Sequence, residues 1–266
     1  MTTSPTEFPE PVADPMAVAA DSAPTGALSA ASARDVARVL LGRPLALGGL
    51  VWIGLMVVLA FFGSLIAPFG ENDVDVPNML KGPSAAHWFG TDELGRDVLS
   101  RVIIAARPSL EVSVVSVAFA LVAGVLLGLI AGYYGRFADS FVMRCMDILF
   151  SFPVMLLAIA IVAVLGAGIG NAMIAIAVVY TPIFARITRA SVLGVREETY
   201  VRAAVSIGVP DREIIARHIL PNVAGPVIVQ TSLSLGFAIL TEAALSFLGL
   251  GVQPPEPSWG GMLYEA

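Results

Sequence analysis

The chain has 266 residues, of which 57% are hydrophobic and 14% are charged, and its net charge is −6. Soluble domains carry about 25% charged residues, whereas the apolar residues here fall into blocks of about 20, the length that crosses a bilayer as a helix. These features exclude an ordinary soluble domain and predict an all-α integral membrane protein. A single cysteine and two histidines exclude an intrachain disulfide and make an all-protein metal site unexpected. No basic block indicates nucleic-acid binding.

The apolar blocks predict a polytopic helical bundle behind an N-terminal tail. Residues 1–33 are rich in Ala, Pro, Ser and Thr and lack hydrophobic periodicity, which predicts disorder, and no feature of this tail indicates a function. The membrane domain is expected over residues 34–266. Five spans are predicted within it, at about 45–67, 110–133, 141–165, 172–187 and 223–248. Pro182 lies inside the fourth predicted span, where it favours a kink or an early end of the helix.

The distribution of basic residues predicts how these spans are oriented. Loops on the cytoplasmic side of a membrane are enriched in Lys and Arg. If the N-terminus is cytoplasmic, most of the 15 basic residues lie inside. The basic residues outside are then Lys81, Arg96, Arg101 and Arg107. We therefore expect a cytoplasmic tail and a large cytoplasmic loop over residues 188–222.

The second predicted span carries three glycines at four-residue spacing, Gly124, Gly128 and Gly132. Residues four apart lie on one face of a helix. Small residues there allow a second helix to approach closely, which matters because lipid provides no hydrophobic drive for helix association. The spacing predicts tight packing of this helix in the bundle.

Few charged residues enter the predicted spans. Arg144 and Asp147 open the third span with a spacing that allows an ion pair. Glu242 lies deep in the fifth span, where an unpartnered carboxylate is costly. Such a residue marks either a polar site on a transport pathway or a hydrogen-bonded contact that fixes helix packing, and the sequence leaves both alternatives open.

The cytoplasmic loop has the pattern of two helices joined by a sharp turn. Residues 200–207 contain no helix breaker, Gly208 is suited to a left-handed cap, and Pro210 is suited to the first turn of a second helix. Pro221 interrupts the pattern near the start of the fifth span. The first helix is therefore expected to project from the membrane, and the small side chains of Ala203 and Ala204 would let a partner approach closely.

Three segments resemble the permease subunits of binding-protein-dependent ABC importers. In that family a cytoplasmic loop carries Glu-Ala-Ala, three residues, Gly, nine residues and Ile-x-Leu-Pro. Residues 203–204, 208 and 218–221 match this spacing, although Arg202 replaces the Glu and His218 replaces the first Ile. HWFGTDELGRDVLSR at 87–101 and LSFLGLGVQPPEPSWGGML at 245–263 resemble the dipeptide/oligopeptide branch, and the short segment after the first span is similar to that of the second permease of the pair.

The resemblance implies a type I ABC importer permease fold, with residues 34–266 as the transmembrane permease domain and a sixth span following the five that are visible. The resemblance also implies that the predicted helix at 200–207 contacts an ATPase subunit and that the loop around residues 91–97 forms part of the outer surface. The coupling residues would be Val201, Arg202, Ala203, Ala204 and Gly208. The loop signature would be Thr91, Asp92, Gly95, Arg96 and Asp97. A purely structural role explains these residues equally well, with Thr91 as the N-cap of a helix and Asp92 and Glu93 in its first turn.

The resemblance also implies a set of partners and a location. The partners would be a second homologous permease, two ATPase subunits or domains that bind ATP and Mg, and an extracytoplasmic substrate-binding protein, all at the bacterial cytoplasmic (inner) membrane. The chain lacks a GxxxxGK[ST] motif, so we expect no catalytic residues and no bound cofactor. Peptides are the expected cargo, and nickel, haem or glutathione are the alternative cargoes. The alternative mechanism is ion-coupled transport through Glu242.

Overall fold

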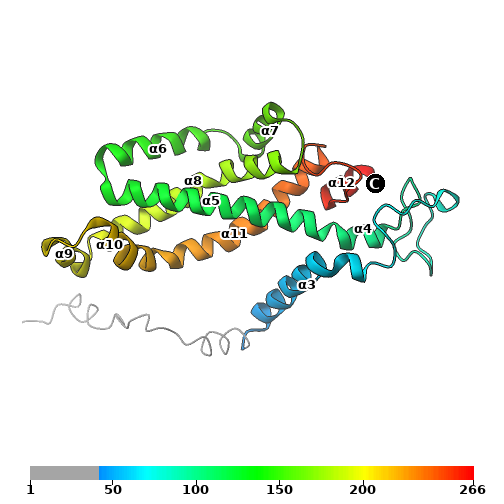
Figure 1. Ribbon diagram of the computed structural model, residues 1–266, viewed down its shortest axis with the longest axis horizontal. Coiled ribbons are helices and arrows are strands. Elements are labelled where there is room, and N and C mark those ends of the chain that lie inside the picture. The colour runs from blue at the N-terminus through cyan, green and yellow to red at the C-terminus, as the bar shows by residue number, and fades with distance from the viewer. Residues whose placement is uncertain (1–41) are drawn as a thin grey trace, which may run out of the picture. The chain divides into compact units, whose positions relative to one another are not determined.

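The computed structural model describes residues 42–266, which are mostly helical (Figure 1). The predicted tail at residues 1–33 lies outside the described residues. The elements are α3 (Pro44–Ile66), η1 (Val76–Asn78), α4 (Val98–Ile104), α5 (Ala106–Tyr134), α6 (Arg136–Phe150), α7 (Val154–Leu165), α8 (Ile169–Arg196), α9 (Thr199–Ser206), α10 (Asp211–Ile214), the π-helical turn η2 (Ile215–Ile219), α11 (Leu220–Phe247) and α12 (Trp259–Glu265). The predicted all-α membrane class is confirmed.

Within residues 42–266, four stretches of helix are long and apolar enough to cross a membrane. They are Pro44–Ile66, Val98–Tyr134, Ile169–Arg196 and Asp211–Phe247. A fifth is counted if α6 and α7, which are bent by 91° at the break between them, together form one broken span. The contacts divide the chain into two units, Met1–Ile53 and Gly54–Ala266. Every contact described below lies within the second unit.

The third apolar block is not one helix, contrary to the prediction for residues 141–165. Helix α6 ends at Phe150, and α7 begins at Val154 after Pro153. Proline has no N–H to donate, and it disfavours helical geometry in the residue before it. Pro153 therefore forms the N-cap of α7 rather than an interior position of a longer helix.

The fourth apolar block is longer than predicted because α8 continues through Pro182 to Arg196. Of the two outcomes that Pro182 favoured, a kink or an early end of the helix, the early end does not occur. Pro182 lies on a buried face of α8 that also contains Val179 and Ala185, at three-residue spacing on either side of it. Tertiary packing of such a face supplies most of the stability of a helix, and here it outweighs the local cost of the proline.

The core of the second unit is built on α5, α8 and α11, which pack against one another (Figure 1). Helices α5 and α8 run parallel, because Gly124 lies against Phe184 and Gly132 lies against Val192. A Cβ atom added to Gly124 would sit 2.4 Å from the Cβ atom of Phe184, and one added to Gly132 would sit 2.8 Å from the Cβ atom of Val192. The glycines thus lie where the two helices come closest.

Ion pairs between α6 and α8 replace the pair that the sequence suggested within α6. Asp147 accepts a hydrogen bond from Nη2 of Arg186 at 2.6 Å, and Asp139 forms a bidentate pair with Arg189. The expected pairing of Arg144 with Asp147 is therefore wrong. A guanidinium on a neighbouring helix meets the carboxylate at a better distance than a residue one turn away.

Candidate functional site

Two sites stand at opposite ends of the bundle, and the first is the short helix α9. Val201 is fully buried and Ala204 is 7% exposed. Both belong to an apolar cluster that also contains Leu129 of α5, Val192 of α8 and Ile219 of η2. These two side chains hold α9 against the ends of the long helices, at an end of the bundle that we call the α9 end.

Gly208 forms the turn that follows α9. Its φ angle is +80°, a conformation that side chains with a Cβ atom adopt only at a cost. The N–H of Val209 donates to the carbonyl of Ala204 at 3.1 Å and that of Gly208 donates to the carbonyl of Val205 at 3.0 Å, so the carbonyls at the end of α9 are satisfied. The predicted left-handed cap is present, and it reverses the chain into α10.

The chain then passes into α11 without the interruption expected at Pro221. Helix α10 leads into the π-helical turn η2, and α11 begins at Leu220 with Pro221 in its first turn. Pro221 cannot donate to a carbonyl one turn earlier, and a π-helical turn accommodates such a change in hydrogen bonding. The hydroxyl of Tyr133 in α5 donates to Asp211 at 2.8 Å and ties this corner to the bundle.

The outward face of α9 has a different character from its buried face. Arg202 and Ala203 are exposed, and Ile207, at the end of the helix, is 80% exposed. Among residues 42–266, Arg202 takes part in no ion pair. Near the start of the helix, partial burial raises the pKa of Tyr200, and the charge of Glu198 raises it further. The exposed surface of α9 is thus a small, mixed apolar and basic patch.

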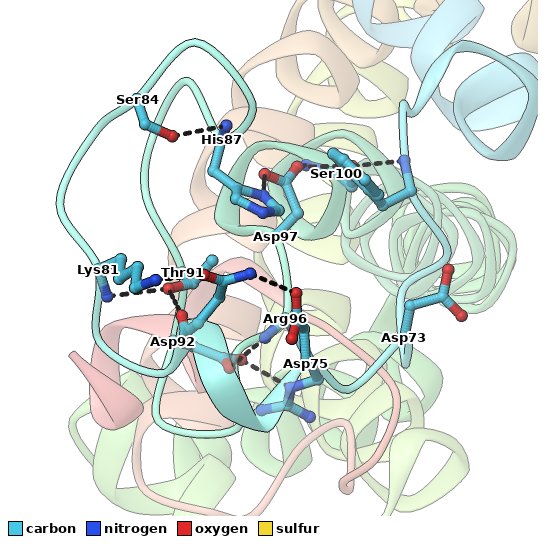
Figure 2. A network of polar contacts seen from close by, with 12 residues as sticks. Asp73, Asp75, Lys81, Ser84, His87, Thr91, Asp92, Arg96, Asp97 and Ser100 are labelled. Carbon is cyan, nitrogen blue, oxygen red and sulfur yellow. Dashed lines mark hydrogen bonds and ion pairs between the residues drawn. The ribbon is translucent and has the colours of Figure 1, made fainter.

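The second site is the loop of residues 67–97 at the other end, which we call the loop end. Figure 2 shows that polar side chains gather around Asp92 and around Asp97, whereas Asp73 points away from both groups. Asp92 accepts hydrogen bonds from the backbone N–H groups of Leu94 and Arg96, each at 2.9 Å, and from Nε of Arg96 at 2.6 Å. Gly95 has a φ of +77°, and a Cβ atom there would sit 1.9 Å from the carbonyl oxygen of Asp75. The loop is therefore a compact, internally bonded scaffold.

Asp97, not Thr91, is the N-cap of the helix that follows the loop. Its carboxylate accepts from the backbone N–H of Ser100 at 2.8 Å and from the Ser100 hydroxyl at 2.7 Å, while Nδ1 of His87 lies 2.9 Å away (Figure 2). Burial by itself would raise the pKa of Asp97, but the hydrogen bonds from Ser100 and His87 outweigh it and lower the pKa below its usual 3.8.

Thr91 has a different structural role from the predicted one. No helix begins at Thr91, so the prediction that it caps one with Asp92 and Glu93 in the first turn is wrong. Its hydroxyl accepts from the N–H of Lys81 at 2.9 Å and donates to the carbonyl of Asn78. Thr91 therefore joins two arms of the loop.

The loop signature extends to residues that sequence reasoning missed. Arg101 is 2% exposed and lies 3.3 Å from both Asp92 and Glu265 of α12. Arg96 also reaches Glu265, at 3.4 Å. The indole N–H of Trp259 donates to the carbonyl of Val102 at 3.1 Å. Ion pairs and a hydrogen bond thus join α12 to the loop and to α4. Sequence spacing could not have predicted these contacts, because the residues are more than 150 positions apart.

Glu242 lies inside the bundle and is fully buried. Its Oε1 atom accepts a hydrogen bond from the hydroxyl of Ser246 at 2.7 Å, and that hydroxyl accepts from the N–H of Val252 at 3.2 Å. Within residues 42–266 its Oε2 atom has no hydrogen-bond partner, and neither does the buried hydroxyl of Ser109 in α5. The Ser246 hydroxyl thus links the end of α11 to the turn that leads to α12, and Glu242 accepts from that hydroxyl.

Comparison with known proteins identifies the family. Residues 124–266 match the binding-protein-dependent transport system inner membrane component, and residues 33–83 match the N-terminal TM domain of oligopeptide transport permease C. The dipeptide transport system permease protein DppC of Alkalihalophilus pseudofirmus is 48% identical over 233 residues, which cover 88% of this chain and 77% of the relative. The glutathione transport system permease protein GsiD of Pectobacterium atrosepticum is 43% identical over 234 residues, covering 88% and 78%.

Solved structures show the same fold. The inward facing MetNI methionine ABC transporter aligns with a TM-score of 0.54 and 18% identity, over 63% of this chain and 80% of that one. The similarity at this identity concerns the fold alone, whereas the family matches cover more than half of the sequence. The chain therefore belongs to the family of inner membrane components of binding-protein-dependent transport systems, which are the permease subunits of ABC importers.

Proposed function

We propose that this permease subunit forms half of a translocation pathway for small peptides, together with a second homologous permease. The proposal rests on the similarity to a dipeptide permease at 48% identity and to glutathione permeases at 43–47%. The glutathione relatives fit the alternative cargo that the sequence left open, and glutathione shares a free ammonium group and free carboxylates with a dipeptide. The substrate would be delivered by a binding protein outside the membrane.

The α9 end faces the cytoplasm in this proposal, and the loop end faces outward. The α9 end carries Arg136, Arg189, Arg196, Arg202, Arg212 and Arg217, whereas the loop end carries Lys81, Arg96, Arg101 and Arg107. Cytoplasmic loops are enriched in Lys and Arg, so this bias supports a cytoplasmic N-terminus in the bacterial inner membrane.

Coupling to the ATPase subunits is assigned to α9. The observation that carries this assignment is the division of α9 into a buried face that anchors it and an exposed face that the described part of this chain leaves uncovered. Val201 and Ala204 fix the helix, and Gly208 shapes the turn, so these residues act by positioning. Arg202, Ala203 and Ile207 make the contact with the ATPase.

ATP is bound and hydrolysed by the partner ATPase subunits or domains, not by this chain. Closure of the ATPase pair moves the two α9 helices, and the bundle changes from inward-facing to outward-facing. Such a cycle is a coupling between distant sites, in which each ligand biases the same conformational equilibrium. The rigid anchoring of α9 to α5, α8 and η2 provides the mechanical link.

The proposal is tested by co-purification of the tagged chain with its co-expressed partners. We compare the wild type with the double variant Ala203→Glu and Ile207→Glu, which places two carboxylates on the exposed face without disturbing the buried one. Ala85→Glu, at an exposed position of the loop end, is the matched control. The variant should lose the ATPase and keep the second permease, and the control should keep both.

A different result would overturn the assignment. If the double variant keeps the ATPase at the level of the control, α9 is not the contact. If a well-folded wild type binds no ATPase at all, ATP-driven import is excluded. Retention of substrate-stimulated ATP hydrolysis in the control variant verifies that the complex is active.

A further inference from the structure

A cavity of about 710 Å³ lies at the loop end. It is formed by the end of α3, the start of the loop, the start of α5, and the segment before α12. A volume of this size falls within the range of about 300–1,000 Å³ that is usual for small-molecule sites. None of the functions proposed above for α9 or for the loop scaffold makes use of this cavity.

Charged side chains of both signs line the cavity. Glu71 comes from the loop, Arg107 and Glu111 from α5, and Glu256 from the segment before α12. Within the part of the chain that the structure describes, none of these four takes part in an ion pair. At the same end, Asp92, Arg96, Asp97 and Arg101 are all paired. The charged residues of the loop scaffold thus pair with one another, whereas those that line the cavity have no ion-pair partner within residues 42–266 and can bind a ligand.

Most of the other residues that line the cavity are apolar, among them Phe61, Phe69 and Pro108. An apolar wall with a few convergent polar groups is the usual composition of a ligand site. Three carboxylates and one guanidinium suit a molecule with an ammonium group at one end, a carboxylate at the other and a compact apolar body between them.

The cavity also lies next to the N-terminal end of an exposed face that continues along α5. Arg107 and Glu111 are followed on this face by Val114, Ala118 and Val122, all of them exposed. The four-residue and three-residue steps between them place these residues along one side of the helix. A ligand held between the charged residues would therefore lie at one end of a stripe of exposed, mostly apolar residues that runs along α5.

We propose that this cavity is a receiving subsite for zwitterionic small peptides. The carboxylates of Glu71 and Glu111 take the ammonium terminus, and Arg107 takes the carboxylate terminus. This inference rests on the proposed function, because the peptide must first be released at the loop end. It adds a binding site in the permease itself, with a preference for free peptide termini that is independent of the binding protein.

The test uses protection of an introduced thiol in the assembled transporter without its binding protein. Ser64 is an exposed residue that lines the cavity, and Cys145 is the only native cysteine. We introduce Ser64→Cys in a Cys145→Ser background, reconstitute the complex in nanodiscs, and measure the rate of labelling by a membrane-impermeant thiol reagent. The probes are the dipeptide Ala-Ala and its blocked analogue N-acetyl-Ala-Ala-amide.

Ala-Ala should slow the labelling about tenfold at ten times its half-protecting concentration, as mass action requires, and the blocked analogue should not. The variant Glu71→Gln with Glu111→Gln should raise the half-protecting concentration about tenfold, because two charge-assisted contacts are lost. Glu93→Gln, an exposed loop residue outside the cavity, is the matched control and should leave it unchanged. An unchanged labelling rate without peptide shows that the variants fold alike.

Four results would overturn the inference. Resistance of the Ser64→Cys variant to labelling in the complex would show that another subunit fills the cavity. Equal protection by both probes, or an unchanged half-protecting concentration in the glutamine variant, would show that the charges recognise no peptide termini. ATP-driven uptake of Ala-Ala with the binding protein present is measured in parallel. Uptake without protection refutes the subsite alone, whereas absence of uptake refutes the proposed function.

Discussion

Gly128 of α5 lies so close to α8 that a Cβ atom added to it would sit 2.6 Å from the carbonyl oxygen of Ala185. A real Cβ atom cannot approach a backbone oxygen this closely, so α5 can present no side chain to α8 at this position. Close approach of this kind replaces the hydrophobic drive that lipid does not provide. It also keeps α8 in register with α5, and both helices contribute to the cluster that anchors α9.

The first prediction concerns this contact. Gly128→Ala should force α5 and α8 apart and lower the melting temperature in detergent, because overpacking costs about 1–3 kcal/mol. Gly236→Ala in α11 is the matched control, since a Cβ atom there meets nothing within 4 Å and Ala favours a helix by about 1 kcal/mol over Gly. Melting is measured as loss of monodisperse protein on heating. Equal melting temperatures for the two variants would contradict the prediction.

The contrast between two prolines shows what the sequence determined and what it did not. The apolar blocks predicted the class of fold and the approximate position of each membrane segment. Pro153 and Pro182 both lie within such blocks, yet the chain bends at Pro153 and passes through Pro182 as a helix. The difference comes from the buried face of α8, and burial depends on contacts between distant segments that local pattern does not contain.

The charged residues show the same limit. Asp147 had a possible partner one turn away in Arg144 and instead pairs with Arg186 of α8. The loop motif was recognised as a signature, but its connection to Glu265 of α12 was not predictable, because it joins residues far apart in the sequence. The turn at Gly208 was predictable, since a single glycine with a proline two residues later specifies it locally.

A second prediction concerns Gly208. Gly208→Ala meets no steric contact from neighbouring residues, so its cost arises only from the φ of +80° and should amount to roughly 1–2 kcal/mol. Gly208→Asn should cost less, because Asn tolerates this conformation. Hydrogen–deuterium exchange of α9 should rise in the order wild type, Asn and Ala. Retention of the ATPase should fall in the same order. Faster exchange in Asn than in Ala would refute the strain argument.

A third prediction concerns the acid sensitivity of the loop. The folded pKa of Asp97 lies below its ordinary 3.8, so the contribution of this carboxylate to stability is fully present above pH 3.8 and is lost as the pH falls through the folded value. Hydrogen–deuterium exchange of the 97–104 segment, corrected for intrinsic rates, should therefore accelerate below pH 3.8 in the wild type. Asp97→Asn should exchange faster at neutral pH and should change less below pH 3.8. A variant that keeps the full acid response would exclude Asp97 as its source.

The last prediction decides between the two roles left open for Glu242. Its carboxyl group is fully buried and accepts from the hydroxyl of Ser246, an arrangement suited to holding the end of α11 in place. Glu242→Gln keeps an acceptor oxygen for Ser246 and should retain near-normal melting and uptake. Glu242→Leu leaves the Ser246 hydroxyl without its acceptor, which costs about 1–3 kcal/mol, and should lower both melting temperature and uptake.

Uptake of a labelled dipeptide into proteoliposomes, with ATP inside and the binding protein outside, is the measurement, and melting of the same preparations is the control. If Glu242→Gln melts like the wild type and yet transports nothing, the residue acts through its charge. Ion-coupled transport through Glu242 then becomes the hypothesis to pursue, and dependence of uptake on an ion gradient instead of ATP would establish it. If uptake follows melting in both variants, Glu242 serves packing alone, because a residue that carries an ion must lose function when its charge is removed.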